Sequence, residues 1–261
     1  MPQPDRRKQL GVMLLVVLGL GLAAFAILNI FGGKPGSPTK PGGISVTRIP
    51  LAQAPLQVRE AAERLGTSRV GFVIPQGNVA YLVISTGPAG ERIDVTGARR
   101  SGTIIDVDVR SSTGGEQLIV AVLKAPVTDT RLVQFHLDGF AAGIPALVNT
   151  DNLPLMALPD KGSIVIAGPV SQERVAGGMV QVSGFARIFE GQISIAVYSA
   201  GKGRILGESK NVMAAIGAPN WGSFKVNIPY EVIKGLSEGV VLVYDQDSGA
   251  KTAIPIKFVT Q

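Results

Sequence analysis

The chain contains one histidine and no cysteine, and this limits the catalytic and metal chemistry available to it. His136 alternates with Val133, Phe135 and Leu137, a pattern typical of a half-buried strand, and it falls on the polar face. A zinc site needs several nitrogen or sulfur ligands. A Ser-His-Asp triad would have to use His136, yet no Gly-x-Ser-x-Gly elbow accompanies it. We therefore predict a solvated strand histidine, with no catalytic residue, no metal site and no cofactor.

Two groups of carboxylates could also carry chemistry. Asp106 and Asp108 fall on one face of a strand, where paired carboxylates can act as acid and base or bind calcium. The alternative, which we favour, is the polar half of an amphipathic strand. The segment 245–249 resembles a calcium loop but lacks the terminal glutamate of an EF-hand, so a hairpin turn explains it better.

Trp221 is the only tryptophan and lies among turn residues in the segment 219–223. An aromatic side chain at a loop edge can anchor a partner or a sugar ring, which makes Trp221 the candidate ligand or partner contact. It can equally cap the core of the predicted sandwich, and we favour that alternative.

An apolar run from Leu10 to Phe31 follows three basic residues. As a helix, about 22 residues would span about 33 Å, enough to cross a bilayer core. The basic residues predict a cytoplasmic N-terminus and an extracytoplasmic body at the cell membrane. The alternative is a signal peptide cleaved after Ala26, since Ala24 and Ala26 form a small-x-small site.

The composition excludes some classes of partner and fold. The formal net charge is +6, and three of the positive charges precede the apolar run. No clustered basic stripe follows, so we expect no nucleic-acid partner. An exported chain without cysteine has no disulfides, so its domains must depend on ordinary hydrophobic cores. The remaining length suits one large or two ordinary domains.

The pattern along the chain predicts a mainly β protein with an N-terminal transmembrane helix, a small α+β domain and a C-terminal immunoglobulin-like β-sandwich. A run of Pro and Gly indicates a linker after the apolar segment. The predicted divisions are a cytoplasmic tail 1–9, an anchor 10–31, a linker 32–46, an α+β domain 47–140, an inter-domain linker 141–160 and a sandwich 161–261.

In the middle region the pattern predicts a short helix at 55–65, ended by Gly66, and then strands that pair antiparallel through short turns. The predicted strands are 69–74, 78–85, 103–110, 117–123 and 131–137. The last hundred residues carry about seven short strands with turn signals between them, which is typical of an immunoglobulin-like sandwich without a disulfide. These strands are 163–167, 179–185, 192–198, 204–210, 223–230, 239–244 and 253–259.

The C-terminal stretch resembles the immunoglobulin-like domain associated with bacterial spore-germination (GerM-type) domains. The residues that carry the resemblance are 164–166 with Gly168-Pro169, then 182–186, and above all Phe189-Glu190-Gly191 before the next strand. The resemblance implies an exported, noncatalytic module of spore-forming or related bacteria.

The middle region resembles more weakly the C-terminal domain of the protease-complex subunit PrcB. The similarity lies in the strand 80–85, in 92–95 and in the strand 103–109, whereas the turn 87–91 departs from the Thr-Gly-Gly-Tyr of that family. This resemblance implies accessory or scaffolding work beside a secreted protease.

Three functions follow from these observations. The first is a noncatalytic, membrane-anchored binding or scaffolding protein of the bacterial envelope, linked to sporulation or germination, with an envelope protein or a cell-wall polymer as partner. The second is an accessory subunit or inhibitor of an extracytoplasmic protease. The third is an envelope hydrolase, which would require a concave pocket of converging polar groups.

Overall fold

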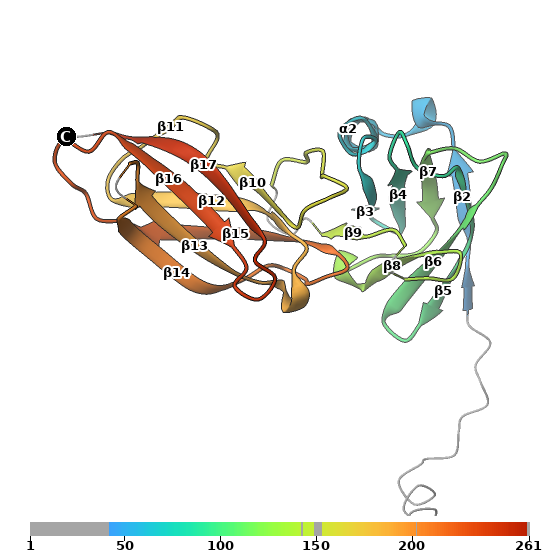
Figure 1. The fold of residues 1–261 in the computed structure, drawn as a ribbon. Coiled ribbons are helices and arrows are strands. Elements are labelled where there is room, and N and C mark those ends of the chain that lie inside the picture. Colours follow the sequence, from blue (N-terminus) through green and yellow to red (C-terminus); the bar gives the residue numbers. More distant parts are fainter. Residues whose placement is uncertain (1–41, 142, 149–152, 202, 260–261) are drawn as a thin grey trace, which may run out of the picture. The chain divides into compact units, whose positions relative to one another are not determined.

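A computed structural model describes residues 42–141, 143–148, 153–201 and 203–259 (Figure 1). The predicted cytoplasmic tail, the anchor 10–31 and most of the linker lie outside the described residues. Within the described residues, no helix has the length and apolar character needed to cross a membrane. The chain from Gly43 onward forms one compact unit.

The N-terminal part of this unit consists of strands, two turns of 3-10 helix and one α-helix. In chain order the elements are β1 (Gly42–Ile44), β2 (Val46–Ile49), η1 (Leu51–Gln53), α2 (Leu56–Leu65), β3 (Arg69–Gln76), β4 (Val79–Thr86), β5 (Ile93–Ser101), β6 (Ile104–Ser111), β7 (Leu118–Leu123), η2 (Thr130–Leu132), β8 (Val133–Leu137) and β9 (Ala146–Val148). The predicted helix and the five predicted strands are all present, to within two residues at each end. The strands β1, β2, β5 and β9 were not predicted.

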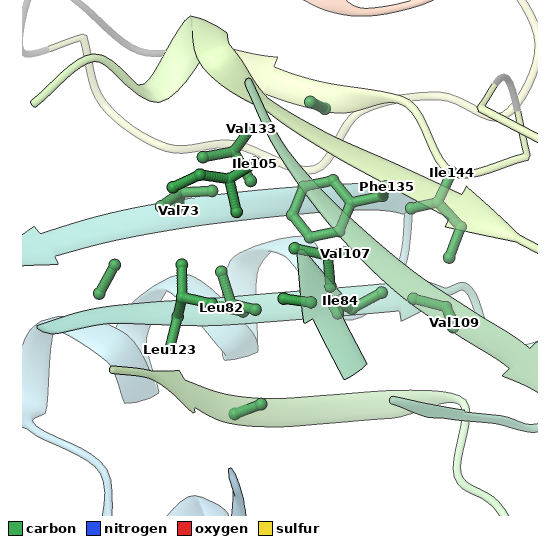
Figure 2. Close-up of a cluster of buried hydrophobic side chains, with 14 of the residues drawn as sticks. Val73, Leu82, Ile84, Ile105, Val107, Val109, Leu123, Val133, Phe135 and Ile144 are labelled. Atoms are coloured by element: carbon green, nitrogen blue, oxygen red, sulfur yellow. The ribbon is translucent and has the colours of Figure 1, made fainter. Parts of the chain in front are cut away.

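The strands of the N-terminal part belong to two sheets that enclose a common core. One sheet has the order β1-β5-β6-β8, and β9-β3-β4-β7-β2 forms part of the other. Figure 2 shows the core between them, where Phe135 and Val107 from the first sheet meet Leu82 and Ile84 from the second. The apolar positions of β6 and β8 alternate as their sequences predict, so one face of each strand packs into this core.

The pairing of β6 differs from the prediction of antiparallel strands throughout. The pair β3–β4 is antiparallel through a short turn, as predicted. Strand β4 also pairs antiparallel with β7, which does not follow it in the sequence. However, β6 does not pair with the following strand β7: it lies between β5, antiparallel, and β8, parallel. The turn-forming residues Thr113-Gly114-Gly115, which follow β6, therefore lead from one sheet to the other and not into a hairpin. A glycine-rich turn is compatible with either connection.

Helix α2 covers the second sheet on the face away from that core. Its buried residues Val58, Ala61, Ala62 and Leu65 are spaced three and four apart, which places them on one side of a helix. Pro55 precedes the first turn and Gly66 ends the helix, as predicted. As a result β3 and β4 are covered on both faces, and their sequences are apolar at successive positions.

The C-terminal part is an immunoglobulin-like sandwich, as predicted. Its elements are β10 (Ile164–Gly168), β11 (Glu173–Val175), β12 (Met179–Ala186), η3 (Phe189–Gly191), β13 (Gln192–Ser199), β14 (Ile205–Met213), β15 (Trp221–Pro229), β16 (Glu238–Tyr244) and β17 (Lys251–Phe258). One layer is β10-β12-β15 and the other is β11-β17-β16-β13-β14. Alternate residues of both layers, such as Ile195, Phe224 and Val241, form the core between them.

Strand β9 joins the two parts into one sheet. It lies in the segment 141–160, which the sequence predicts to be an inter-domain linker, and it pairs in parallel with β3 on one side and β15 on the other. The resulting sheet has the order β10-β12-β15-β9-β3-β4-β7-β2. The predicted domain boundaries stay predictions. The two parts are connected by the backbone hydrogen bonds of β9 as well as by the continuous chain.

A third hydrophobic cluster draws its residues from both parts; we call it the shared cluster. Helix α2, strands β3 and β4, and strand β9 contribute from the N-terminal side, while Phe185 and Trp221 contribute from the sandwich. Its fully buried members include Val58, Leu65, Val83, Phe185 and Trp221. Because burial of apolar surface is the main stabilising term, this cluster couples the folding of the two parts.

Candidate functional site

A row of charged side chains crosses the polar face of β5, β6 and β8. His136 Nε2 lies 2.7 Å from Asp106 Oδ1, and Arg99 contacts Asp108 at 2.8 Å and Asp106 at 3.6 Å. The register explains the meeting, since Arg99 pairs with Asp106 on β5–β6 and His136 with Asp108 on β6–β8. Sequence reasoning placed His136, Asp106 and Asp108 on the polar faces of their strands, but it did not connect them and did not identify Arg99.

The contacts of this row are those of a structural ion-pair network. His136 and Asp106 keep only 15% and 14% of their side-chain surface, so the prediction of a solvated histidine was wrong in that respect. Each carboxylate faces a partner, which compensates for its partial burial. Among the described residues, no group of three or more metal-ligating side chains gathers.

The segment 245–249 forms the turn between β16 and β17, as predicted. Asp245 accepts hydrogen bonds from the backbone N–H groups of Asp247 and Ser248 and from the Ser248 hydroxyl. Burial raises the pKa of Asp245, but these hydrogen bonds outweigh it and the pKa lies below its usual value. The carboxylate therefore closes a hairpin turn, and its oxygens are already used within the loop.

Trp221 lies in the core, at the start of β15, and none of its surface is exposed. Trp221 is thus a core residue, but it belongs to the shared cluster and not to the core of the sandwich, which the sequence favoured. Its burial leaves the indole no surface with which to contact a ligand directly. Arg187 covers the ring, with its guanidinium carbon 4.9 Å from the ring centroid. Burial lowers the pKa of Arg187. Arg187 also donates hydrogen bonds to the carbonyl oxygens of Asp160 and Gly162, so it holds the chain before β10 against the tryptophan.

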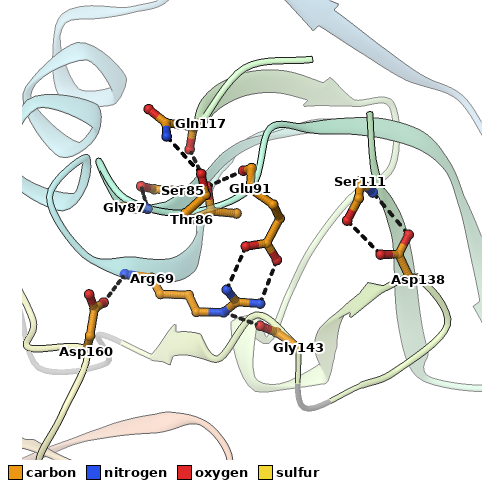
Figure 3. Close-up of polar contacts among 11 residues, drawn as sticks. Arg69, Ser85, Thr86, Gly87, Glu91, Ser111, Gln117, Asp138, Gly143 and Asp160 are labelled. Carbon is orange, nitrogen blue, oxygen red and sulfur yellow. Dashed lines mark hydrogen bonds and ion pairs between the residues drawn. The ribbon is translucent and has the colours of Figure 1, made fainter. Parts of the chain in front are cut away.

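A second polar network centres on Arg69, the first residue of β3 (Figure 3). Its guanidinium makes two hydrogen bonds to Glu91, of 2.9 and 3.0 Å, and one of 2.6 Å to the carbonyl oxygen of Gly143. The Arg69 backbone N–H donates to Asp160. Arg69 therefore ties together the turn 87–91, the segment before β9 and the chain that leads to β10.

The turn 87–91 is fixed by this network and by its own hydrogen bonds. The hydrogen bonds from the Arg69 guanidinium hold the pKa of Glu91 below its usual value. Thr86 donates to the backbone carbonyl of Glu91, and Gln117 donates to those of Pro88 and Gly90. Sequence reasoning did not identify Glu91 as a positioning residue, because its partner is 22 residues away and no local spacing marks the pair.

A cavity with a volume of about 750 Å³ lies beside β2 and β7. Ile49, Leu118 and Val120 provide apolar surface, and Leu51 stands exposed at its edge. Arg48 forms ion pairs with Glu116 and, at 3.7 Å, with Asp94. Because β2 was not predicted, the sequence offered no reason to expect a groove here.

Comparison with known proteins identifies the class of the sandwich. Residues 163–250 match the model of the immunoglobulin-like domain of bacterial spore germination. This confirms the resemblance seen in the sequence and agrees with the two-layer fold of β10 to β17.

A comparison with curated proteins finds none that matches the chain. Among solved structures, the crystal structure of an engineered protein from the Northeast Structural Genomics Consortium matches at 14% identity and a TM-score of 0.28. That match covers 49% of this chain but only 25% of the engineered one.

Proposed function

We propose that the protein is a noncatalytic binding or scaffolding protein of the bacterial envelope that acts in sporulation or germination. The observation that carries this proposal is the match of residues 163–250 to the immunoglobulin-like domain of bacterial spore germination. Immunoglobulin-like sandwiches present loops and strand edges on a rigid core, and such surfaces recognise partners without any chemistry of their own.

The proposal includes anchoring at the cell membrane through the segment 10–31, with the described body on the extracytoplasmic side. The support is the sequence itself: a basic triplet, an apolar run of membrane length and a linker rich in Pro and Gly. An anchored protein searches for its partner in two dimensions, which raises the effective concentration of the partner.

The shared cluster and the joined sheet support a scaffolding role. Strand β9 pairs with both β3 and β15, and Trp221 packs among residues of α2 and β3. A body held together in this way presents surfaces of both parts in a constant arrangement, and less ordering is needed when a partner binds.

The experiment that tests the proposal is crosslinking of the full-length protein in its native cell, followed by purification and mass spectrometry. Envelope or germination components among the crosslinked species are the expected result. A protease as the dominant species would instead support the accessory-subunit function suggested by the PrcB resemblance. Turnover of a wall or peptide substrate by the purified protein would contradict the noncatalytic proposal.

A further inference from the structure

A small polar cavity lies at one end of the immunoglobulin-like sandwich, where η3, β13, β14 and the β16–β17 turn meet. Its volume is about 140 Å³. The lining residues that matter here are Phe189, Glu190, Gln192, Asn211 and Asp247. They come from three separate segments, namely η3 with the start of β13, strand β14 and the β16–β17 turn. The backbone hydrogen bond from Ala214 to Gly191 holds η3 against the end of β14.

The aromatic ring at this cavity is unusually exposed for its size. Phe189 keeps 78% of its surface open, the highest value among the large exposed hydrophobic residues described. An isolated exposed apolar side chain needs no explanation. Phe189, however, lines a concave site whose other lining residues are polar except for Ile193, which places a flat apolar face beside hydrogen-bonding groups.

The polar walls contain both donors and acceptors. Gln192 and Asn211 carry amide groups that can donate and accept, while Glu190 and Asp247 carry carboxylates that only accept. Within the described residues, the side chains of these four make no hydrogen bond or ion pair to another residue. Their hydrogen-bonding capacity is therefore available to a ligand.

Two residues of the cavity wall also adopt left-handed backbone conformations. Glu190 has φ 56° and Asn211 has φ 58°, and in a residue with a β-carbon this conformation costs free energy. Asn211 sits at an irregularity where the β13–β14 register shifts. The surrounding fold thus holds both side chains at the cavity instead of in regular strand positions.

We infer that this cavity binds a sugar ring of a polysaccharide. The inference rests on the proposed function, and of the two partners named there it selects the cell-wall polymer and not an envelope protein. A pyranose ring presents an apolar C–H face that can pack on Phe189. Each of its hydroxyls both donates and accepts, so it can donate to a carboxylate and accept from an amide. The cationic group of a lysine or arginine side chain only donates hydrogen bonds, so by itself it would leave the amide donors of Gln192 and Asn211 unused.

The test is binding of the full-length protein, in detergent micelles, to a β-1,4-linked hexamer of N-acetylglucosamine, measured by isothermal titration calorimetry. We expect saturable binding that the Phe189→Ala variant weakens by about threefold to tenfold, the range for loss of one aromatic contact. Asp247→Ala should also weaken it. The matched control is Phe140→Ala, since Phe140 is exposed to 74% but lies in the N-terminal part.

A second measurement separates sugar from peptide. Cosedimentation with purified peptidoglycan is compared before and after an amidase removes the stem peptides, and undiminished binding to the bare glycan strands is expected. Binding that requires the peptides, no binding to either glycan probe, or equal weakening by Phe189→Ala and Phe140→Ala would overturn the inference. If carbohydrate binding is absent while crosslinking still recovers envelope proteins, only this inference fails; if crosslinking recovers no envelope component either, the proposed function fails with it.

Discussion

The N-terminal part and the immunoglobulin-like sandwich are both two-layer β structures, but they use their layers differently. In the sandwich, the cluster that contains Ile195, Phe224 and Val241 lies between two sheets of one continuous segment of chain. In the N-terminal part, β3 and β4 pack against the first sheet on one face and against α2 on the other. The second of these faces is continued by Phe185 and Trp221 of the sandwich.

Each part therefore has a hydrophobic core of its own, and the shared cluster draws its residues from both parts. The shared cluster cannot form until both parts are in place, whereas the sandwich core needs only its own strands. We therefore expect substitutions in the shared cluster to affect both parts and substitutions in the sandwich core to affect the sandwich first.

The largest effect is expected for Trp221→Ala. Trp221 is fully buried in the shared cluster, so the substitution removes a large apolar side chain and leaves a cavity. The free energy of unfolding should fall by about 3–5 kcal/mol. Amide hydrogen exchange should become faster in α2 and β3 as well as in β15, which denaturant unfolding and exchange mass spectrometry would measure.

The matched control for this prediction is Phe224→Ala, three residues along the same strand. Phe224 is 1% exposed and belongs to the sandwich core alone. A comparable loss of stability is expected, with faster exchange confined to the sandwich at low denaturant. If Trp221→Ala left the amide hydrogen exchange of α2 unchanged, the shared cluster would not couple the two parts.

The comparison also explains what the sequence could predict. Seven of the eight described strands of the sandwich were predicted to within three residues at each end, as in β13, where Ile193, Ile195 and Val197 alternate and point inward. The same holds for β6 and β8. The three-residue strand β11 was not predicted. Strand β9 is only three residues long and buried on both sides, which leaves it neither length nor alternation as a signal.

The pairing partners were less predictable than the strands, for a physical reason. Register and order depend on contacts between distant segments, such as β6 with β8 or β9 with β15, and no local pattern encodes them. The surroundings of Trp221 depend on such contacts too, since only the fold brings Phe185 and α2 into one cluster with it. The motif Phe189-Glu190-Gly191 was seen in the sequence, but its cavity requires Asn211 from β14 and Asp247 from the β16–β17 turn.

The substitution Gly71→Ala on β3 tests the core between the two sheets of the N-terminal part. A β-carbon at position 71 would lie 2.4 Å from ring carbons of Phe135, so the ring or the strand must shift. Overpacking of this kind should lower the free energy of unfolding by about 1–3 kcal/mol. Gly97→Ala on β5 is the control, because no atom lies within 4 Å of its added β-carbon. Equal stability of the two variants in thermal unfolding would contradict the close packing of Phe135 on β3.

A smaller and pH-dependent effect is expected for Glu91→Gln, which removes the charge that Arg69 binds. The side chains of both residues keep 34% of their surface, so solvent screens the pair and the loss at neutral pH should be about 0.5–1 kcal/mol. The pKa of Glu91 is lowered in the folded protein, so its contribution is complete above the pKa of the unfolded chain and disappears as the pH falls through the folded pKa.

Urea denaturation of the wild type and of Glu91→Gln at a series of pH values between 7 and about 2 would measure this contribution. The two stability curves should converge at the acidic end. Asp94→Gln serves as a control. Asp94, on β5, lies 3.7 Å from Arg48, so its ion pair is longer than the pair of Glu91 with Arg69. A difference that stayed constant with pH would show that Glu91 acts through packing and not through its charge.

The smallest effect is expected at the contact between Arg187 and Trp221, where the two parts meet. Arg187→Met keeps the apolar stem but removes the cation above the ring and two hydrogen bonds to the chain before β10. A cation over an indole ring is worth about 0.5–1 kcal/mol at an exposed site and more where it is desolvated. A double-mutant cycle with Trp221→Phe would measure the coupling, because the smaller ring weakens the cation–π interaction but stays in the core. A coupling energy near zero would mean that Arg187 stabilises the junction through its carbonyl hydrogen bonds alone, and the tryptophan would then join the two parts only by apolar packing.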